Sequence, residues 1–308
     1  MKFTIHQASR QGPRPYNQDR LAYSYSKDAL MIVVADGMGG HRNGEIAAQL
    51  AVKILAVAFE KMAQPTLLDP ARFLVEHIRQ VHAAIDSYTV AHDWFDSPRT
   101  TIVVAIIQGN KLYSAHVGDS RFYHFSQGQL VYRSEDHSLV QMLYRKGLLQ
   151  KRHMATHPER HKIYNCLGGD VAPQIDLGQP RKLVEGDTLL LCTDGLWTLV
   201  QDDEIGIILH ASPVNEALPE LLDLAESRAD EHGDNMSAIA LHWGERLDDQ
   251  LTISTLPMLL GATTTIISPI GQLSPQNGGG DNTAPDLTDD DIERAIADIQ
   301  AAIRRTRR

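Results

Sequence analysis

One stretch of the chain reads Ala29-Leu30-Met31-Ile32-Val33-Val34-Ala35-Asp36-Gly37, an uncharged apolar run that is closed by Asp-Gly. A second stretch, Thr188-Leu-Leu-Leu-Cys-Thr-Asp194-Gly195, ends in the same way. About six apolar residues bounded by turn signals predict a buried strand. The glycine lets the backbone turn sharply where the strand ends. The sequence therefore predicts two strands buried in a sheet, each with a carboxylate at its rim.

Two further aspartates extend this pattern. Asp119 occurs in Val117-Gly118-Asp119-Ser120-Arg121, and Asp234 occurs in Gly233-Asp234-Asn235. Any one of these aspartates alone would be read as an ordinary turn residue. Together with Asp36 and Asp194 they indicate a cage for hard divalent cations, because Mg²⁺ and Mn²⁺ prefer carboxylate, carbonyl and water oxygens. Metal-assisted hydrolysis is the leading hypothesis that follows from these residues.

Five short motifs follow one another along the chain. They are Arg14-Pro-Tyr-Asn17-Gln18-Asp19, Asp36-Gly37-Met38-Gly39-Gly40-His41, Gly118-Asp119-Ser120-Arg121, Asp194-Gly195-Leu196-Trp197 and Gly233-Asp234-Asn235. In this order they resemble the metal-dependent serine/threonine protein phosphatases of the PPM (type 2C) family in their bacterial form. The resemblance covers about residues 1–244. It implies a hydrolase that removes phosphate from phosphoserine and phosphothreonine in proteins by means of a metal-activated bridging water.

The pattern of elements favours an α+β fold. Apolar residues at helical spacing predict helices over residues 45–62 and 70–91. Strands bracket pairs of helices without a regular βαβα rhythm, which distinguishes this chain from a doubly wound α/β protein. The resemblance implies two packed antiparallel β-sheets flanked by helices on both sides, with the metals in a cleft at one edge.

The resemblance also implies a set of metal ligands for Mn²⁺ or Mg²⁺, with two tight sites. The carboxylate of Asp36 would bridge both ions, and the carbonyl of Gly37 would help to bind one of them. Asp194 and Asp234 would complete the protein ligands of the first ion. Asp19, in the Asn-Gln-Asp segment, would support the second ion directly or through water.

Three more residues are candidates by the same resemblance. Asp119 would help to hold a third, weaker ion that shares Asp194, although it could instead pair locally with Arg121. Arg14 matches the phosphate-binding arginine of the family, and a planar guanidinium can clamp two phosphate oxygens. His41 could protonate the leaving alkoxide, or it could be a packing residue at the start of the following helix. Many animal relatives carry a histidine directly after Asp-Gly, where this chain has Met38.

Composition excludes several classes of protein. The formal net charge of −10 argues against nucleic acid as a partner, which would favour a basic face. Two cysteines, Cys166 and Cys192, give no disulfide framework. Cys166 is followed by Leu-Gly-Gly-Asp-Val-Ala, without the arginine that a cysteine-dependent phosphatase needs. The N-terminus lacks the apolar run of a signal peptide, so a cytoplasmic protein is expected.

The chain divides into three predicted regions. Residues 1–246 hold every motif and form the expected catalytic domain. Residues 247–285 are rich in Thr, Ser, Pro and Gly, as linkers are, and the uncharged stretch 251–273 is too polar for a membrane span. Residues 286–308 carry an isoleucine stripe (Ile292, Ile296, Ile299 and Ile303) and predict a short amphipathic helix. That helix is either a docking element or a terminus without function.

The sequence is compatible with three functions. An active phosphatase would act on phosphorylated proteins, with a cognate Ser/Thr kinase and its targets as natural partners. A catalytically dead relative would act as a binding module, but Asp36, Asp194 and Asp234 are all present. A metal-dependent phosphodiesterase uses similar carboxylates. The basic segment 145–162 includes His153, His157 and His161, and Pro158 interrupts any helical metal face that these histidines could form. The resemblance implies that this segment is a flap beside the cleft, where it would contact the substrate.

Overall fold

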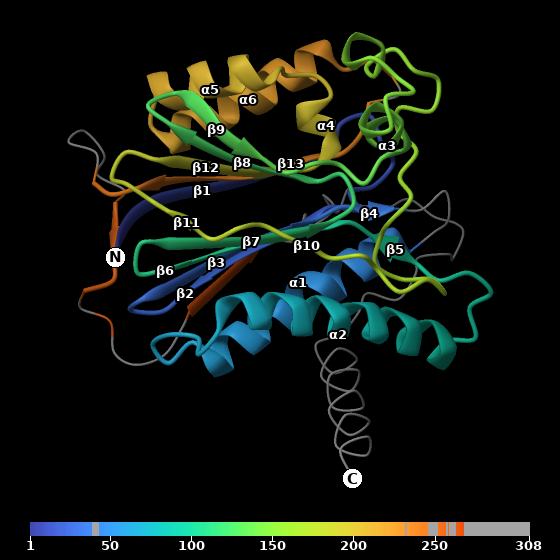
Figure 1. The fold of residues 1–308 in the computed structure, drawn as a ribbon. Coiled ribbons are helices and arrows are strands. Elements are labelled where there is room, and N and C mark those ends of the chain that lie inside the picture. The colour runs from blue at the N-terminus through green and yellow to red at the C-terminus, as the bar shows by residue number, and fades with distance from the viewer. Residues whose placement is uncertain (39–42, 232, 246–251, 257, 259–262, 268–308) are drawn as a thin grey trace, which may run out of the picture.

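Two antiparallel sheets pack face to face, and helices cover the outer face of each sheet, so the fold has four layers (Figure 1). The computed structural model describes residues 1–308 except 39–42, 232, 246–251, 257, 259–262 and 268–308. Helices α5 (Asp202–Ala211) and α6 (Val214–Arg228) lie above the six-stranded sheet, here called the first sheet, and α1 (Gly44–Met62) and α2 (Pro70–Ala91) lie below the seven-stranded second sheet. The predicted α+β class and the helix-flanked pair of sheets are confirmed.

The first sheet has the strand order β14-β1-β13-β12-β8-β9. In that order its strands span Ile253–Ser254, Lys2–Arg10, Met236–Trp243, Thr188–Cys192, Arg121–Ser126 and Gln129–Arg133.

The second sheet has the order β10-β7-β6-β3-β2-β15, with β11 also paired to β7. Its strands span Asp176–Leu177, Lys111–Val117, Ile102–Gln108, Ala29–Ala35, Arg20–Tyr25 and Thr263–Ile267, and β11 spans Arg181–Lys182. A separate two-stranded ribbon joins β4 (Gly37–Met38) to β5 (Arg99–Thr100).

Six α-helices and one short 3₁₀ helix occur among the described residues. The α-helices are α1 (Gly44–Met62), α2 (Pro70–Ala91), α3 (Leu139–Arg145), α4 (Asp194–Trp197), α5 (Asp202–Ala211) and α6 (Val214–Arg228), and the 3₁₀ helix is Lys151–His153. The two long helices agree with the predicted ranges 45–62 and 70–91 to within one residue. On α1 the predicted apolar face is buried at Ile46, Leu50 and Ile54.

The central strands explain the apolar runs in the sequence. All seven residues of β3 are buried, because one face packs between the two sheets and the other packs against α1. The five residues of β12 are buried in the same manner, between the opposite sheet and the α5–α6 layer. A strand that is covered on both faces needs apolar residues at every position, which is why these runs show no alternation.

Antiparallel pairing brings one set of strand ends to a common edge. Arg20 at the start of β2 pairs with Ala35 at the end of β3, and Ile102 at the start of β6 pairs with Val117 at the end of β7. In the first sheet, Cys192 at the end of β12 pairs with Arg121 at the start of β8. The loops that carry the predicted acidic residues therefore leave both sheets at the same edge.

Part of the predicted linker pairs with the sheets. Strand β14 pairs with β1, and β15 pairs with β2. Between them Thr255 is buried, and its Oγ1 accepts a hydrogen bond from the Met1 amino group at 2.7 Å and donates one to the Lys27 carbonyl at 2.7 Å. The segment 286–308, with its predicted helix, lies outside the described residues.

No helix among the residues that the structure describes combines the length and the apolar character needed to cross a membrane. The uncharged stretch 251–273 accordingly contains no such helix where it is described. The cytoplasmic location inferred from the N-terminus stays a prediction.

The pairing of β14 and β15 generates a prediction about stability. Thr255→Val removes the buried hydroxyl but keeps the volume, so we expect a loss of about 1–3 kcal/mol and a fall in Tm of several degrees. Thr255→Ser keeps the hydroxyl and should stay close to the unchanged chain. Turnover of a small phosphoester should be the same for both variants. An unchanged Tm for Thr255→Val would show that this segment is not anchored.

Candidate metal centre

Five aspartates gather at the edge where the two sheets present their loops. Asp19 precedes β2, Asp36 follows β3, Asp119 lies between β7 and β8, Asp194 begins α4, and Asp234 precedes β13. Burial raises the pKa of Asp36 well above its ordinary value, and the charges of the other four aspartates raise it further. Each carboxylate is therefore close enough to affect the ionisation of Asp36.

Side chains from two distant loops fix the position of Asp19. The Thr193 hydroxyl, next to Asp194, donates a hydrogen bond to Asp19 Oδ2 at 3.0 Å. The backbone N–H of Gln18 donates to Asn235 Oδ1 at 2.9 Å, and Asn235 Nδ2 donates to the Gln11 carbonyl at 2.8 Å. The motifs that contain Asp19, Asp194 and Asp234 are thus joined by direct hydrogen bonds.

Arg14 lies at the exposed rim of this cluster. Its Nη2 is 2.8 Å from Asp234 Oδ2, and its Nε donates to the Gly233 carbonyl at 3.1 Å. About half of the Arg14 side chain is exposed. Its charge also favours the ionised form of Asp194 and so opposes the rise in the pKa of that group. The structure therefore brings Arg14 to the acidic cluster while its side chain stays half-exposed.

The backbone of Asp36 is held by two threonines that precede β6. The Asp36 N–H donates to Thr101 Oγ1 at 3.2 Å, and the Thr100 hydroxyl donates to the Asp36 carbonyl at 2.8 Å. Thr101 Oγ1 also lies 2.7 Å from Ser120 Oγ, next to Asp119. One threonine therefore connects the Asp36 turn to the Asp119 loop.

Gly37 must be glycine for steric reasons, because a Cβ there would lie 2.3 Å from the Gly44 carbonyl oxygen. His41, the candidate general acid, belongs to residues 39–42, which lie outside the described part of the chain. The structure thus describes this motif only as far as Met38, the last residue of β4.

Burial and like charge raise the pKa of the clustered carboxyls. Burial is the main cause that raises the pKa of Asp19 and of Asp119, each to about 7. The charge of Asp234 raises the pKa of Asp19 further, although hydrogen bonds from Ser237 and Thr193 oppose the rise. The pKa of Asp194 is raised well above its ordinary value, first by burial and then by Asp119, Asp234 and Asp19. Asp19 Oδ1 and Asp194 Oδ1 are buried and accept no hydrogen bond from the residues described.

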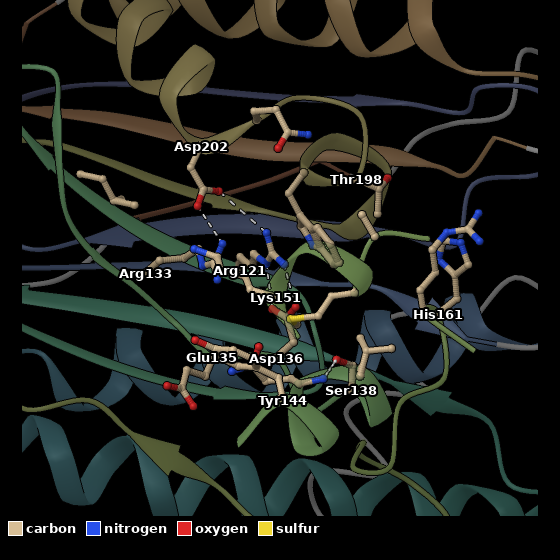
Figure 2. Close-up of a pocket in the computed structure, with 18 of the residues that line it drawn as sticks. Arg121, Arg133, Glu135, Asp136, Ser138, Tyr144, Lys151, His161, Thr198 and Asp202 are labelled. Atoms are coloured by element: carbon tan, nitrogen blue, oxygen red, sulfur yellow. Dashed lines mark hydrogen bonds and ion pairs between the residues drawn. The ribbon is translucent and has the colours of Figure 1, made fainter. Parts of the chain in front are cut away.

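A pocket of about 690 Å³ opens beside the cluster, between α4–α5 and the segment that follows α3 (Figure 2). At its floor, Arg121 forms a two-fold ion pair with Asp136, with N–O distances of 2.8 and 2.7 Å. Asp202 belongs to the same network, because it pairs with Arg133 at 2.7 Å and lies 3.9 Å from Arg121. Five residues of the segment after α3 also line the pocket: Lys151, Met154, Ala155, Arg160 and His161.

The predicted flap is thus close to the acidic cluster. The charge of Asp234 affects the pKa of His161, which burial lowers overall. His153, His157 and His161 do not share a helical face, because residues 151–153 form a single 3₁₀ turn and the described residues that follow form turns. The three-histidine spacing therefore makes no helical metal face, as the interruption by Pro158 indicated.

A second group of titratable side chains was missed by the sequence interpretation. Potential ligand atoms of His116, His137 and Asp176 all lie within 4.8 Å of one another. His116 belongs to β7 and Asp176 to β10, so only the pairing of these strands brings them together. Asp136-His137-Ser138 was visible as a polar segment, but no ligand spacing linked it to His116.

Comparison with known proteins places these observations in a family. The family description "Protein phosphatase 2C" matches residues 8–232. The serine/threonine phosphatase stp of Listeria welshimeri is 33% identical over 231 residues, which cover 73% of this chain and 90% of that protein. The phosphatase PstP of Mycobacterium tuberculosis is 33% identical over 198 residues, which cover 64% of this chain and 37% of that longer protein.

Solved structures agree with the sequence matches. The S. agalactiae serine/threonine phosphatase superposes with a TM-score of 0.71 at 29% identity, covering 79% of this chain and 100% of that one. The catalytic domain of PstP in complex with two manganese ions superposes with a TM-score of 0.66 at 29% identity, covering 78% and 98%. The chain therefore belongs to the bacterial PPM (type 2C) family and is a metal-dependent protein serine/threonine phosphatase.

Proposed function

We propose that the five clustered aspartates hold the divalent cations of this phosphatase, and that phosphoserine and phosphothreonine side chains of proteins are hydrolysed beside them. One observation supports this proposal. Burial and the charges of the neighbouring aspartates raise the pKa of Asp36 and Asp194, and the nearby Arg14 lowers the pKa of Asp194 only in part. The proposed catalytic region lies within residues 1–246, where all of the assigned residues occur.

The residues fit a cation on physical grounds. Several buried carboxylates that repel one another are unfavourable unless they are protonated or bound to a positive ion. Asp19 Oδ1 and Asp194 Oδ1 are buried acceptors without a donor in the described structure, and they suit a hard cation. Manganese fits this donor set, and the structure of PstP holds two such ions.

We assign the ligands as the resemblance implies. Asp36 would contact both tightly bound ions, with the Gly37 carbonyl assisting one of them. Asp194 and Asp234 would complete the first site, and Asp19 would support the second. Asp119 would hold a third, weaker ion together with Asp194. The ions are Mn²⁺ or Mg²⁺.

The chain itself contributes charge, position and desolvation. When bound, two divalent cations lower the pKa of a water and offset the negative charge of the phosphoryl group. The Arg14 guanidinium, fixed to Asp234 on one side, offers its exposed N–H groups to phosphate oxygens. His41 is proposed as the general acid from its place in the sequence alone.

The pocket of Figure 2 suits a peptide that flanks the phosphorylated residue. Arg133 and Asp202 neutralise one another, whereas Lys151 is an exposed cation on the flap side. A phosphorylated protein segment, such as that of a cognate Ser/Thr kinase, is the proposed substrate. The net charge of −10 disfavours a nucleic acid in the same place.

The proposed role of Asp36 generates a prediction about catalysis. Asp36→Asn should lower Mn²⁺-dependent kcat for a phosphothreonine peptide by about 1,000-fold or more, because several kcal/mol of charge stabilisation are lost. Asp223→Asn, which removes an exposed carboxylate on α6, serves as the control and should retain full turnover. Full activity of Asp36→Asn across a metal titration would exclude Asp36 as a shared ligand. Hydrolysis of bis-p-nitrophenyl phosphate by the unchanged chain tests for diesterase activity. Faster hydrolysis of this diester than of the phosphothreonine peptide would contradict the proposed phosphomonoester substrate.

The raised pKa of the buried carboxyls generates a prediction about pH. In the metal-free folded protein the pKa of Asp19 is raised to about 7, so its carboxyl stays protonated up to about that pH. In the unfolded chain the same carboxyl loses its proton near pH 4. The stability from this proton is therefore complete below about pH 4 and is lost as pH rises to about 7. Without metal, the Tm of Asp19→Asn should rise relative to the unchanged chain between pH 5 and pH 7.5.

Saturating Mn²⁺ should remove this relative gain at pH 7.5, because a bound cation stabilises the ionised carboxylate of the unchanged chain. Thermal scans of both proteins at the two pH values, with chelator and with Mn²⁺, measure the effect. A Tm difference that does not depend on pH in the chelator would contradict the raised pKa.

A further inference from the structure

One buried histidine, His137, forms two hydrogen bonds with the backbone of the loop that carries Asp119. The Gly118 N–H donates a hydrogen bond to His137 Nδ1 at 3.1 Å, and the His137 N–H donates to the Gly118 carbonyl at 3.0 Å. Gly118 has a φ of +104°, and a Cβ there would lie 2.6 Å from the Thr101 side chain. The loop is therefore confined between His137 on one side and Thr101 on the other.

The hydrogen bonds also decide which nitrogen of His137 carries its proton. The backbone N–H of Gln174 donates to Asn165 Oδ1 at 3.0 Å, which orients the Asn165 amide. Asn165 Nδ2 then donates to His137 Nδ1 at 2.6 Å, in addition to the Gly118 N–H. Nδ1 accepts from two unambiguous donors and is unprotonated. The neutral ring therefore carries its proton on Nε2, which lies 3.2 Å from Asp176 Oδ2.

This tautomer argues against a metal ion between His116, His137 and Asp176. A metal ligand needs a nitrogen lone pair that is free of a proton. His137 Nδ1 already uses its lone pair for the Gly118 and Asn165 donors, and Nε2 would have to lose its proton to bind a cation. His137 is better suited to hold the Asp119 loop than to hold a metal.

A second contact supports the same loop from the pocket side. Trp197 Nε1, three residues after Asp194, donates to the Asp119 carbonyl at 3.0 Å. The Arg121 guanidinium lies 3.4 Å above the Trp197 ring and is fixed by Asp136, as Figure 2 shows for the Arg121–Asp136 pair. The Asp119 backbone is thus tied both to α4, which begins with Asp194, and to the 136–138 segment.

We propose that His137 is a positioning residue, which holds the Asp119 loop in the conformation that completes the weak third metal site shared with Asp194. The Nδ1 atom of His137 carries this positioning role, because it accepts the hydrogen bond from the N–H of Gly118, which directly precedes Asp119. The proposal rests on the proposed role of Asp119. The side chain itself does not contact a metal or the substrate.

The same histidine joins the loop to the base of the flap. Tyr164 N–H donates to the His137 carbonyl at 3.0 Å, and Leu139 N–H donates to the Lys162 carbonyl at 2.8 Å. Asn165, directly after Tyr164, provides the second donor to Nδ1. Hydrogen bonds therefore hold the two ends of the segment 139–164, which lines part of the pocket, next to His137.

Two amide substitutions separate the role of Nδ1 from a packing role. In His137→Asn, Oδ1 can take the place of Nδ1 and accept the Gly118 N–H. In His137→Gln, the amide reaches the position of Nε2 and leaves Gly118 and Asn165 without their acceptor. Both variants alter the buried ring, so a purely structural role would affect them alike. His124→Gln, another buried histidine that pairs with Asp187 at 2.9 Å, is the control.

The experiment is a calorimetric Mn²⁺ titration of the full chain, alongside the Mn²⁺ dependence of phosphopeptide turnover. His137→Gln should weaken the third site by about 10- to 100-fold, as is typical for the loss of a group that orients a ligand, while both tight sites remain. His137→Asn and His124→Gln should retain the binding curve of the unchanged chain, whatever their Tm. Equal curves for the Asn and Gln variants, or loss of the tight sites in His137→Gln, would overturn the proposal.

Asp119→Asn, measured in the same way, distinguishes failure of this inference from failure of the proposed function. If Asp119→Asn loses the weak site and His137→Gln keeps it, only the positioning role is wrong. If Asp119→Asn itself keeps the weak site, the assignment of Asp119 is wrong. Zn²⁺ bound by the unchanged chain and lost in His116→Asn would instead show that His116, His137 and Asp176 form a metal site.

Discussion

Repulsion among the carboxylates of Asp19, Asp36, Asp119, Asp194 and Asp234 is the constraint on which the rest of this structure depends. Burial strengthens that repulsion, because charges in a low-dielectric interior are poorly screened. The pKa of Asp36 shows the result, since burial and all four neighbours raise it. Such a cluster persists because two packed sheets hold its backbone in place, and the proposed binding of divalent cations would relieve the repulsion. The fold can therefore be understood as a scaffold that keeps like charges together.

The sheets achieve this through their strand ends and through a few polar side chains between the loops. Thr101 joins the Asp36 turn to Ser120, and Thr193 joins Asp194 to Asp19. Asn235 ties the loop that contains Arg14 to Asp234. Hydroxyl and amide groups can bridge backbones without adding charge, so the loops are fixed and the negative field of the site is retained. His137 performs the same task for Asp119.

The apolar runs before Asp36 and Asp194 were enough to predict buried strands, because a strand covered on both faces must be apolar throughout. The gathering of distant aspartates followed from their common place at strand ends and from the resemblance to a family. His137 could not be predicted, because its role depends on a backbone N–H from another loop. Strand β15 was hidden in a Thr-rich segment whose composition is that of a linker, although β-branched residues also favour strands.

Divalent cations are proposed to bind among the clustered aspartates, and the positions of bound manganese are the decisive observation. Anomalous diffraction from crystals of the full chain soaked in Mn²⁺ would show where the ions bind. We expect two strong peaks within ligand distance of Asp36, with Asp194, Asp234 and Asp19 around them, and a weaker peak between Asp119 and Asp194. Manganese bound only by His116, His137 and Asp176, or no peak at the aspartates, would contradict this proposal.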